Sequence, residues 1–157
     1  MNRIVAPSML SADFGHLERD TQMVDRSAAE WVHIDVMDGV FVPNISIGIP
    51  VLKSIRKVTD MFLDVHLMIV EPGRYVEQFC DAGADLVTVH VESDTEEKLH
   101  DAIARIHAKG KRAGVELISI YGVDALRGVS MEPDGTLRIG SLTSFSHITR
   151  DPLIQKY

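Results

Sequence analysis

Short apolar runs alternate with amphipathic stretches from the start of the chain to about Glu116. The runs are rich in Val, Ile and Leu, and the stretches between them carry apolar residues at helical spacing. Pro72 and Gly83 bracket one such stretch, in positions where helices commonly begin and end. The pattern predicts strands at 3–8, 31–36, 61–69, 85–91 and 112–117, and helices at 14–28, 50–58, 72–83 and 94–108.

Strands that alternate with helices predict a parallel sheet with right-handed crossover connections. Both a (β/α)8 barrel and a doubly wound open sheet fit this order. A complete barrel typically needs about 250 residues, and the chain has 157. A barrel would therefore be half built.

The alternation of strand-like and helix-like segments ends near Glu116. Residues 136–139 alternate as an antiparallel strand does, and a turn is expected just before them, at Met131–Gly135. We recognise no further strand–helix unit. The sequence therefore predicts two parts, residues 1–117 as a β/α part and residues 118–157 as a short α+β tail that does not continue it.

Composition narrows the choice of partners. The chain has 16 Lys and Arg against 23 Asp and Glu, a net charge of −7, which argues against binding to nucleic acid. A single cysteine, Cys80, excludes an internal disulfide and fits a reducing compartment. No apolar run approaches the roughly 20 residues of a membrane span, and no signal peptide is evident. We expect a cytoplasmic protein with neither a nucleic-acid nor a membrane partner.

Histidine and carboxylate side chains gather where the expected strands end. His33 and Asp35 are two residues apart on one strand and so point to the same side, while His66 lies near the end of the next strand. Ser8 ends the first expected strand. Because parallel β/α folds carry their sites at the carboxyl ends of strands, we predict a catalytic or metal site here, with a ligand set suited to Zn, Fe, Mn or Co.

Other residues near this edge have two readings. Met37 and Met68 lie two residues beyond Asp35 and His66; they are either an apolar floor that keeps water off a reactive group or core filler. His90, at the end of a later strand, is a weaker candidate for the site.

Four segments carry a close family resemblance: APSMLSADF from Ala6, HIDVMDGVFVPN from His33, DVHLMI from Asp64 and GADLVTVHVE from Gly83. They resemble the ribulose-phosphate 3-epimerases, and the resemblance runs from about residue 4 to about residue 116. The resemblance implies the N-terminal half of a (β/α)8 TIM barrel of the ribulose-phosphate-binding type. It also implies an isomerase of the pentose phosphate pathway that interconverts D-ribulose 5-phosphate and D-xylulose 5-phosphate with a divalent metal, either Zn, Fe, Co or Mn.

The resemblance also implies roles for particular residues. His33, Asp35 and His66 would bind the metal, and Asp35 would exchange the proton at C3. The side chains that would contact substrate are Ser8, His33, His66, Met37 and Met68. The family's second acid/base, an Asp on a later strand, and its phosphate-binding glycines are not recognisable here. We therefore expect weak activity or none, and the alternative is a non-catalytic, chimeric or truncated remnant that at most binds a divalent metal.

The tail has a resemblance of its own. VDALRGV and DGTLRIGSLTSFSHI, within residues 118–157, resemble the FAD-binding medium subunit of the xanthine and carbon monoxide dehydrogenases. The glycine-rich loop that would hold the FAD diphosphate is missing, so we do not expect FAD to bind. The metal, the choice between pentulose and hexulose phosphates, and the formation of a homo-oligomer all stay open.

Overall fold

A computed structural model describes residues 3–117, 129–131, 137–139, 150 and 152–156. The chain divides into two compact units, Met1–Leu117 and Ile118–Tyr157. The first unit contains nearly all of the described structure and the whole candidate site.

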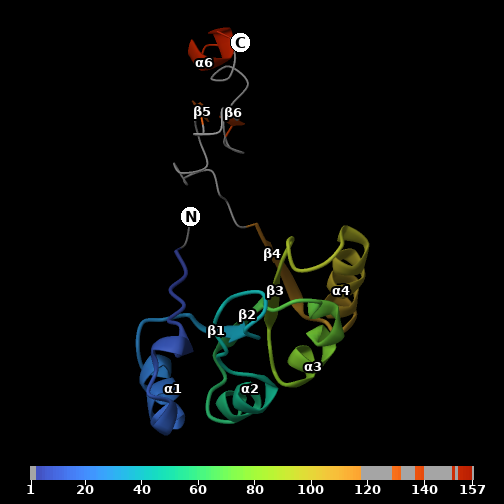
Figure 1. Ribbon diagram of the computed structural model, residues 1–157. Helices are drawn as coiled ribbons and strands as arrows, with labels where there is room; N and C mark the ends of the chain where they lie inside the picture. Colours follow the sequence, from blue (N-terminus) through green and yellow to red (C-terminus); the bar gives the residue numbers. More distant parts are fainter. Residues whose placement is uncertain (1–2, 118–128, 132–136, 140–149, 151, 157) are drawn as a thin grey trace. The chain divides into compact units, whose positions relative to one another are not determined.

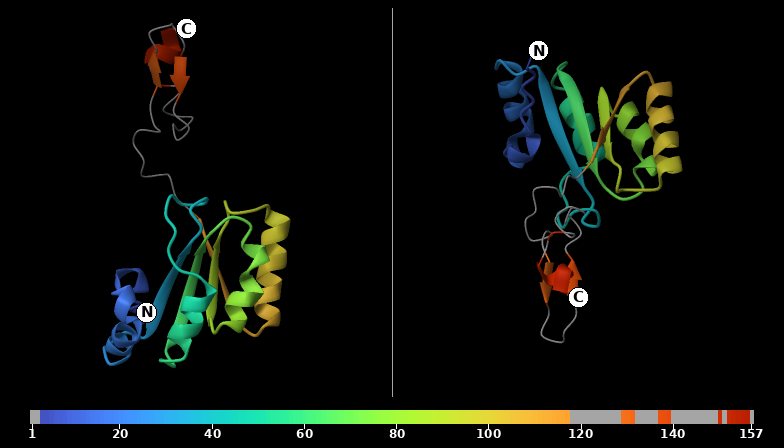
Figure 2. Two further views of the ribbon diagram at one scale, coloured as in Figure 1. Left: turned by 60° about the horizontal axis from the view of Figure 1, so that its bottom comes forward. Right: turned by 90° about the horizontal axis from the view of Figure 1, so that it is seen from above.

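The first unit is built on a four-stranded parallel sheet in the order β1-β2-β3-β4 (Figure 1). Its strands are β1 Trp31–Met37, β2 Phe62–Met68, β3 Leu86–His90 and β4 Arg112–Glu116. Its longer helices are α1 Leu17–Asp25, α2 Ile49–Arg56, α3 Val76–Asp81 and α4 Glu96–Ala108. Each neighbouring pair of these helices is in contact, so they form a continuous layer beside the sheet (Figure 2). This is the predicted α/β architecture, the N-terminal part of a (β/α)8 barrel.

Burial alternates along the strands. In β1 and β2 every second residue is fully buried, and the residues between them are only half buried. The buried set packs with the helices into one core, which includes Val32, Ile34, Leu63, Val65, Val87, Val89, Leu52, Ile55, Leu99 and Ile106. The second face of the sheet carries the polar side chains, and it corresponds to the interior of a complete barrel.

The expected strand at 3–8 is not a regular strand, and the prediction was wrong in this respect. The segment lies beside β1, where the carbonyl of Val5 accepts from the amides of Glu30 and Trp31, at 3.1 and 3.3 Å, and that of Pro7 accepts from His33 at 2.9 Å. A single bridge joins Ser8 to His33. Pro7 has no N–H to donate, which prevents a continuous ladder.

Two expected helices are shorter than predicted. The stretch 14–28 begins with a 3-10 turn, η2 Phe14–His16, before α1 starts. The stretch 72–83 is divided into η3 Pro72–Arg74 and α3, because Tyr75 at φ −126° leaves the helical region. Gly83 ends this stretch at φ +111°, as its sequence position predicted.

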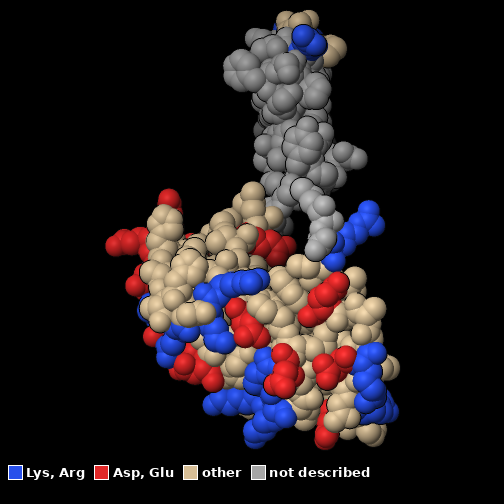
Figure 3. Space-filling model, turned by 180° about the vertical axis from the view of Figure 1, so that it is seen from behind, with Lys and Arg blue, Asp and Glu red and all other residues tan. Residues whose placement is uncertain are grey.

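Salt bridges link adjacent helices on the outside of the first unit. Lys109, just after α4, lies 2.8 Å from Asp81 of α3, and Arg105 of α4 lies 3.2 Å from Glu77 of α3. Basic and acidic side chains are interspersed on the face drawn in Figure 3. That face has no continuous basic strip of the kind that tracks phosphates.

In the second unit, β5 Val129–Met131 pairs with β6 Leu137–Ile139 in antiparallel fashion, and α6 spans Pro152–Lys156. The antiparallel strand expected at 136–139 is confirmed at β6. Most of the flavoprotein-like stretch lies outside the described residues, so that assignment stays a prediction. Among the described helices, none has both the length and the apolar character that crossing a bilayer requires.

Gly83 and Gly110 form a matched pair for a test of the core. Both have positive φ, +111° and +71°. A Cβ on Gly83 would clash with Cγ of Arg56, whereas one on Gly110 would meet no atom of the described residues within 4 Å. The Arg56 guanidinium is held by Asp85 at 3.1 Å and by the carbonyl of Met61 at 3.0 Å, so the side chain cannot easily move aside.

We expect Gly110→Ala to lower the free energy of unfolding by about 1 kcal/mol through backbone strain alone. Gly83→Ala should cost roughly 2 kcal/mol more, since overpacking adds to the strain. Urea denaturation followed by the fluorescence of Trp31, the only tryptophan, measures both. Equal losses in the two variants would contradict the packing argument.

Candidate metal centre

The register of β1 and β2 brings the predicted site residues into adjacent positions. His33 lies opposite Asp64, Asp35 opposite His66 and Met37 opposite Met68. All of these side chains are on the sheet face away from the helices. His33 and Asp64 lie near the middle of their strands, and the other two pairs lie toward the carboxyl ends.

Asp35 lies between the two histidines. Its Oδ1 is 3.1 Å from Nε2 of His33 and 3.5 Å from Nδ1 of His66. The three residues offer ligand atoms within 4.8 Å of one another. Two imidazoles and a carboxylate, all partly buried, are a donor set that Zn, Fe, Co and Mn accept. The residues present therefore fit the divalent metal that the sequence predicted.

A carboxylate behind His33 fixes its orientation. Nδ1 of His33 lies 2.8 Å from Oδ2 of Asp64, which leaves Nε2 turned toward Asp35. The hydrogen bond to Asp64 raises the pKa of His33 above its usual value, although burial opposes the shift. Metal-binding histidines usually have a carboxylate partner of this kind on the second ring nitrogen.

His66 is in a different electrostatic environment. Burial lowers the pKa of His66, and the nearby charge of Glu116 opposes that shift only in part. His66 is therefore neutral at pH 7, which is the form of the ring that binds metals.

Ser8 reaches the same cluster from the segment beside β1. Its hydroxyl donates a hydrogen bond to Oδ2 of Asp35 and accepts one from the amide of Leu10 at 3.2 Å. This contact uses the carboxylate oxygen that does not face the histidines, and it holds the carboxylate in place.

The loop that follows β1 is tied down by Asp38. Oδ1 of Asp38 accepts from the amides of Val40 and Phe41, and Oδ2 accepts from the amide of Val70 beyond β2, each at 2.9 Å. The ring of Phe41 then packs 4.9 Å from that of His90. Asp38 thus joins the carboxyl ends of β1 and β2 beside the site.

Three further residues adjoin the cluster. Asp64 was not singled out from the sequence, although it precedes His66 by two residues and so shares its strand face. Glu116 was missed too; its Oε2 lies 2.9 Å from Nε2 of His66. His90, the weaker candidate, places Nε2 at 2.7 Å from Nε2 of His66.

Cys80 is buried, and burial raises the pKa of its thiol. The thiol is therefore protonated at neutral pH, so Cys80 acts as a packing residue in the core.

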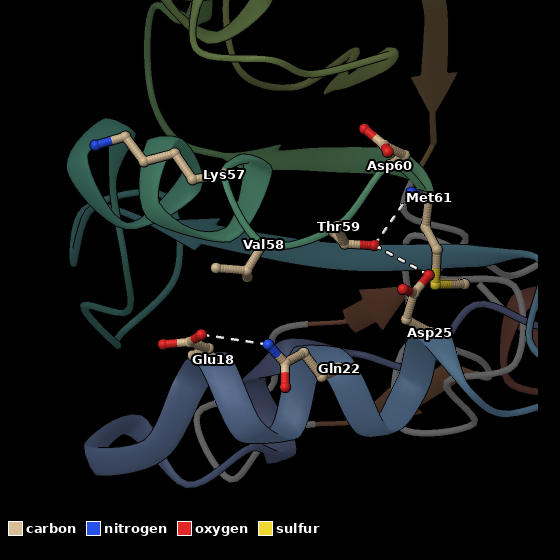
Figure 4. Close-up of a pocket in the computed structure, with 8 residues that line it drawn as sticks. All are labelled: Glu18, Gln22, Asp25, Lys57, Val58, Thr59, Asp60 and Met61. Atoms are coloured by element: carbon tan, nitrogen blue, oxygen red, sulfur yellow. Dashed lines mark hydrogen bonds between the residues drawn. The ribbon is translucent and has the colours of Figure 1, made fainter.

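A separate cleft of about 690 Å³ lies at the opposite end of the strands, between α1 and the segment that leads into β2 (Figure 4). Its polar groups bond to one another: Gln22 donates to Glu18 at 3.2 Å, and Thr59 donates to Asp25 at 3.3 Å. Since parallel β/α proteins have their sites at the carboxyl ends of strands, this cleft is not the candidate active site.

Fold and site together define a class: a β/α protein of the (β/α)8-barrel kind, with an imidazole–carboxylate cluster at the carboxyl ends of its strands. The chain belongs to the ribulose-phosphate 3 epimerase family, which it matches over residues 4–138. The match continues beyond Glu116, where the sequence resemblance was expected to end.

Individual relatives agree with the family assignment. The chain is 53% identical over 128 residues to the ribulose-phosphate 3-epimerase of Synechocystis sp., covering 82% of this chain and 56% of the relative. It is 51% identical over 113 residues to that of Bacillus subtilis, covering 72% and 51%. The chain thus spans about half the length of the curated relatives that it matches.

A solved structure supports the fold independently of sequence. The 7,8-dihydropteroate synthase from Vibrio fischeri superposes with a TM-score of 0.52 at 10% identity, over 73% of this chain and 45% of that one. At that identity the similarity concerns the fold alone.

Asp38→Asn tests the anchoring of the loop. The hydrogen bonds from the amides of Val70, Val40 and Phe41 outweigh the effect of burial and hold the pKa of Asp38 below its usual value of 3.8. An amide offers one oxygen and cannot accept on both sides. We expect a loss of about 0.5 to 1.5 kcal/mol in the free energy of unfolding at pH 7.

The stabilisation by the Asp38 carboxylate should depend on pH. A depressed carboxyl pKa stabilises the fold fully above about pH 4, and the stabilisation is lost as the pH falls through the folded-state pKa. The difference between the parent chain and Asp38→Asn should therefore shrink on acidification to pH 3. Urea denaturation at both pH values measures it, with the exposed Asp60→Asn as control, and a difference that does not depend on pH would exclude this role of the carboxylate.

Proposed function

We propose that this chain binds a divalent metal through His33, Asp35 and His66 and uses Asp35 to move the C3 proton of D-ribulose 5-phosphate, as part of its epimerisation to D-xylulose 5-phosphate. The observation that carries the proposal is the position of the Asp35 carboxylate between two imidazoles at the carboxyl ends of β1 and β2. Family membership supplies the substrate class, because the relatives are named ribulose-phosphate 3-epimerases.

Asp35 is suited to act as the base. A carboxylate takes the C3 proton when it lies within hydrogen-bond reach of it, and Ser8 holds one carboxylate oxygen so that the other faces the cluster. A bound divalent metal would supply Lewis-acid stabilisation of the negative charge that develops on the substrate oxygens.

The remaining residues orient groups and exclude water. Asp64 keeps His33 turned toward Asp35 through the 2.8 Å contact at Nδ1. Met37 and Met68 lie opposite each other one layer beyond Asp35, and we assign them to the apolar surface that keeps water from the reacting carbon.

Inversion at C3 requires a proton to be returned on the opposite face, by a second acid/base group. Removal of the proton and its return on the same face need only Asp35. Exchange of the C3 proton with solvent therefore isolates the part of the reaction that this cluster would perform.

The test is incubation of the chain with Co²⁺ and D-ribulose 5-phosphate in D₂O, with the C3 proton followed by NMR. We expect the proton signal to be lost, and Asp35→Asn to slow the loss by about 100-fold or more. Asp60→Asn, a surface substitution, serves as control and should exchange at the parent rate. A coupled assay for D-xylulose 5-phosphate in the same samples shows whether inversion accompanies exchange.

Exchange with or without inversion supports the role of Asp35. The role of Asp35 would be refuted if the C3 proton exchanged no faster with the chain than with Co²⁺ alone. Equally fast exchange in the parent chain and in Asp35→Asn would refute it too. If the chain bound Co²⁺ but gave no exchange, the alternative of a metal-binding chain without catalysis would stand in its place.

A further inference from the structure

A second group of ligands converges beside the first, at the carboxyl ends of β2, β3 and β4. Nε2 of His66 lies 2.7 Å from Nε2 of His90 and 2.9 Å from Oε2 of Glu116. Nε2 of His90 lies 3.9 Å from the same Glu116 oxygen. We propose that His66, His90 and Glu116 form a second divalent-metal site, with zinc or cobalt as the class of ion that it takes.

Strand register explains why these residues meet. His90 lies opposite Glu116 in the pairing of β3 with β4, and His66 lies opposite Thr88, two residues before His90. All three ligands therefore extend from the sheet face away from the helices. Their positions are fixed by the backbone ladders and do not depend on flexible loops.

The separations of the donor atoms suit a metal ion. The three ligand atoms lie within 4.8 Å of one another. Bonds of about 2.0–2.1 Å in tetrahedral geometry place neighbouring ligand atoms roughly 3.3 Å apart. Small rotations of the side chains would bring the observed separations to that spacing. Two histidines and a glutamate with an open fourth position are a known zinc ligand set.

Each imidazole also has a carboxylate near its second nitrogen. Nδ1 of His66 is 3.5 Å from Oδ1 of Asp35, and Nδ1 of His90 is 3.9 Å from Oε2 of Glu92. Nδ1 of His90 is buried and has no hydrogen-bond partner among the described residues. A metal on Nε2 favours the tautomer with the proton on Nδ1, the nitrogen that lies on the side of these carboxylates.

The ring of His90 is already held for this role. Its side chain is 4% exposed, and the ring of Phe41 packs against it at 4.9 Å. Glu116 is half exposed, at 50%, so an ion can enter from solvent on that side. The site thus joins two restrained imidazoles to one accessible carboxylate.

His66 is shared with the centre at His33 and Asp35. It faces Asp35 through Nδ1 and Glu116 through Nε2. A neutral imidazole has one free lone pair, so His66 can serve one group at a time. The two centres are therefore alternative positions for a single ion.

The second site can be isolated by substitution. His33→Asn removes a ligand of the first centre and leaves His66, His90 and Glu116 in place. We expect this variant to bind Co²⁺, as measured by calorimetry and by the visible absorption of the bound ion. Adding Glu116→Gln or His90→Asn should each weaken that binding at least about 10-fold, whereas Glu97→Gln on the exposed side of α4 should leave it unchanged.

Far-UV circular dichroism of every variant separates ligand loss from unfolding, and Glu116→Gln preserves the shape of a partly exposed side chain. If His33→Asn bound no Co²⁺, or if either second substitution left its affinity unchanged, the three-ligand site would be refuted. One Co²⁺ per unsubstituted chain is expected, and two would refute the sharing of His66. The readout is metal binding, so this result is independent of the proton-exchange assay on Asp35.

Discussion

The alternation of side chains along parallel strands is the constraint on which the rest of this chain depends. In β1 and β2, apolar residues alternate with His33, Asp35, Asp64 and His66, so one face packs under the helices and the other carries the ionisable groups. A shift of one residue would bury these groups beneath the helices without partners, at a large cost in free energy. The packing that stabilises the sheet therefore also aligns the site.

Two histidines on this one face have acquired opposite properties. His33 pairs with Asp64, and that hydrogen bond raises its pKa, while burial lowers the pKa of His66. Both rings nevertheless present a nitrogen to Asp35, because their own strands are adjacent and in register. A metal-binding imidazole must be neutral, so the environment of His66 already favours the ligand form, whereas His33 gives up any proton on Nε2 when an ion binds.

His66 lies between two groups of possible metal ligands on the polar face of the sheet. On one side of it lies the cluster with His33 and Asp35, to which we assign the metal and the proton transfer, and on the other lie His90 and Glu116. Phe41 and Asp38, from the loop after β1, hold this region together through a ring contact and three amide hydrogen bonds. The loop therefore contributes to the shape of the face as well as connecting β1 to α2.

The order of strands and helices, the helix end at Gly83 and the common direction of His33 and Asp35 could be predicted from the sequence, since each of these follows from spacing within one segment. Segment 3–8 was mistaken for a strand, because a regular strand depends on hydrogen bonds to a neighbour that local pattern does not show. The proximity of Asp64 to His33 and of Glu116 to His66 was decided only by the register between strands. Alternation is a property of one chain segment, whereas register is fixed by packing between segments, and for that reason the tertiary structure alone revealed how the two groups of ligands meet.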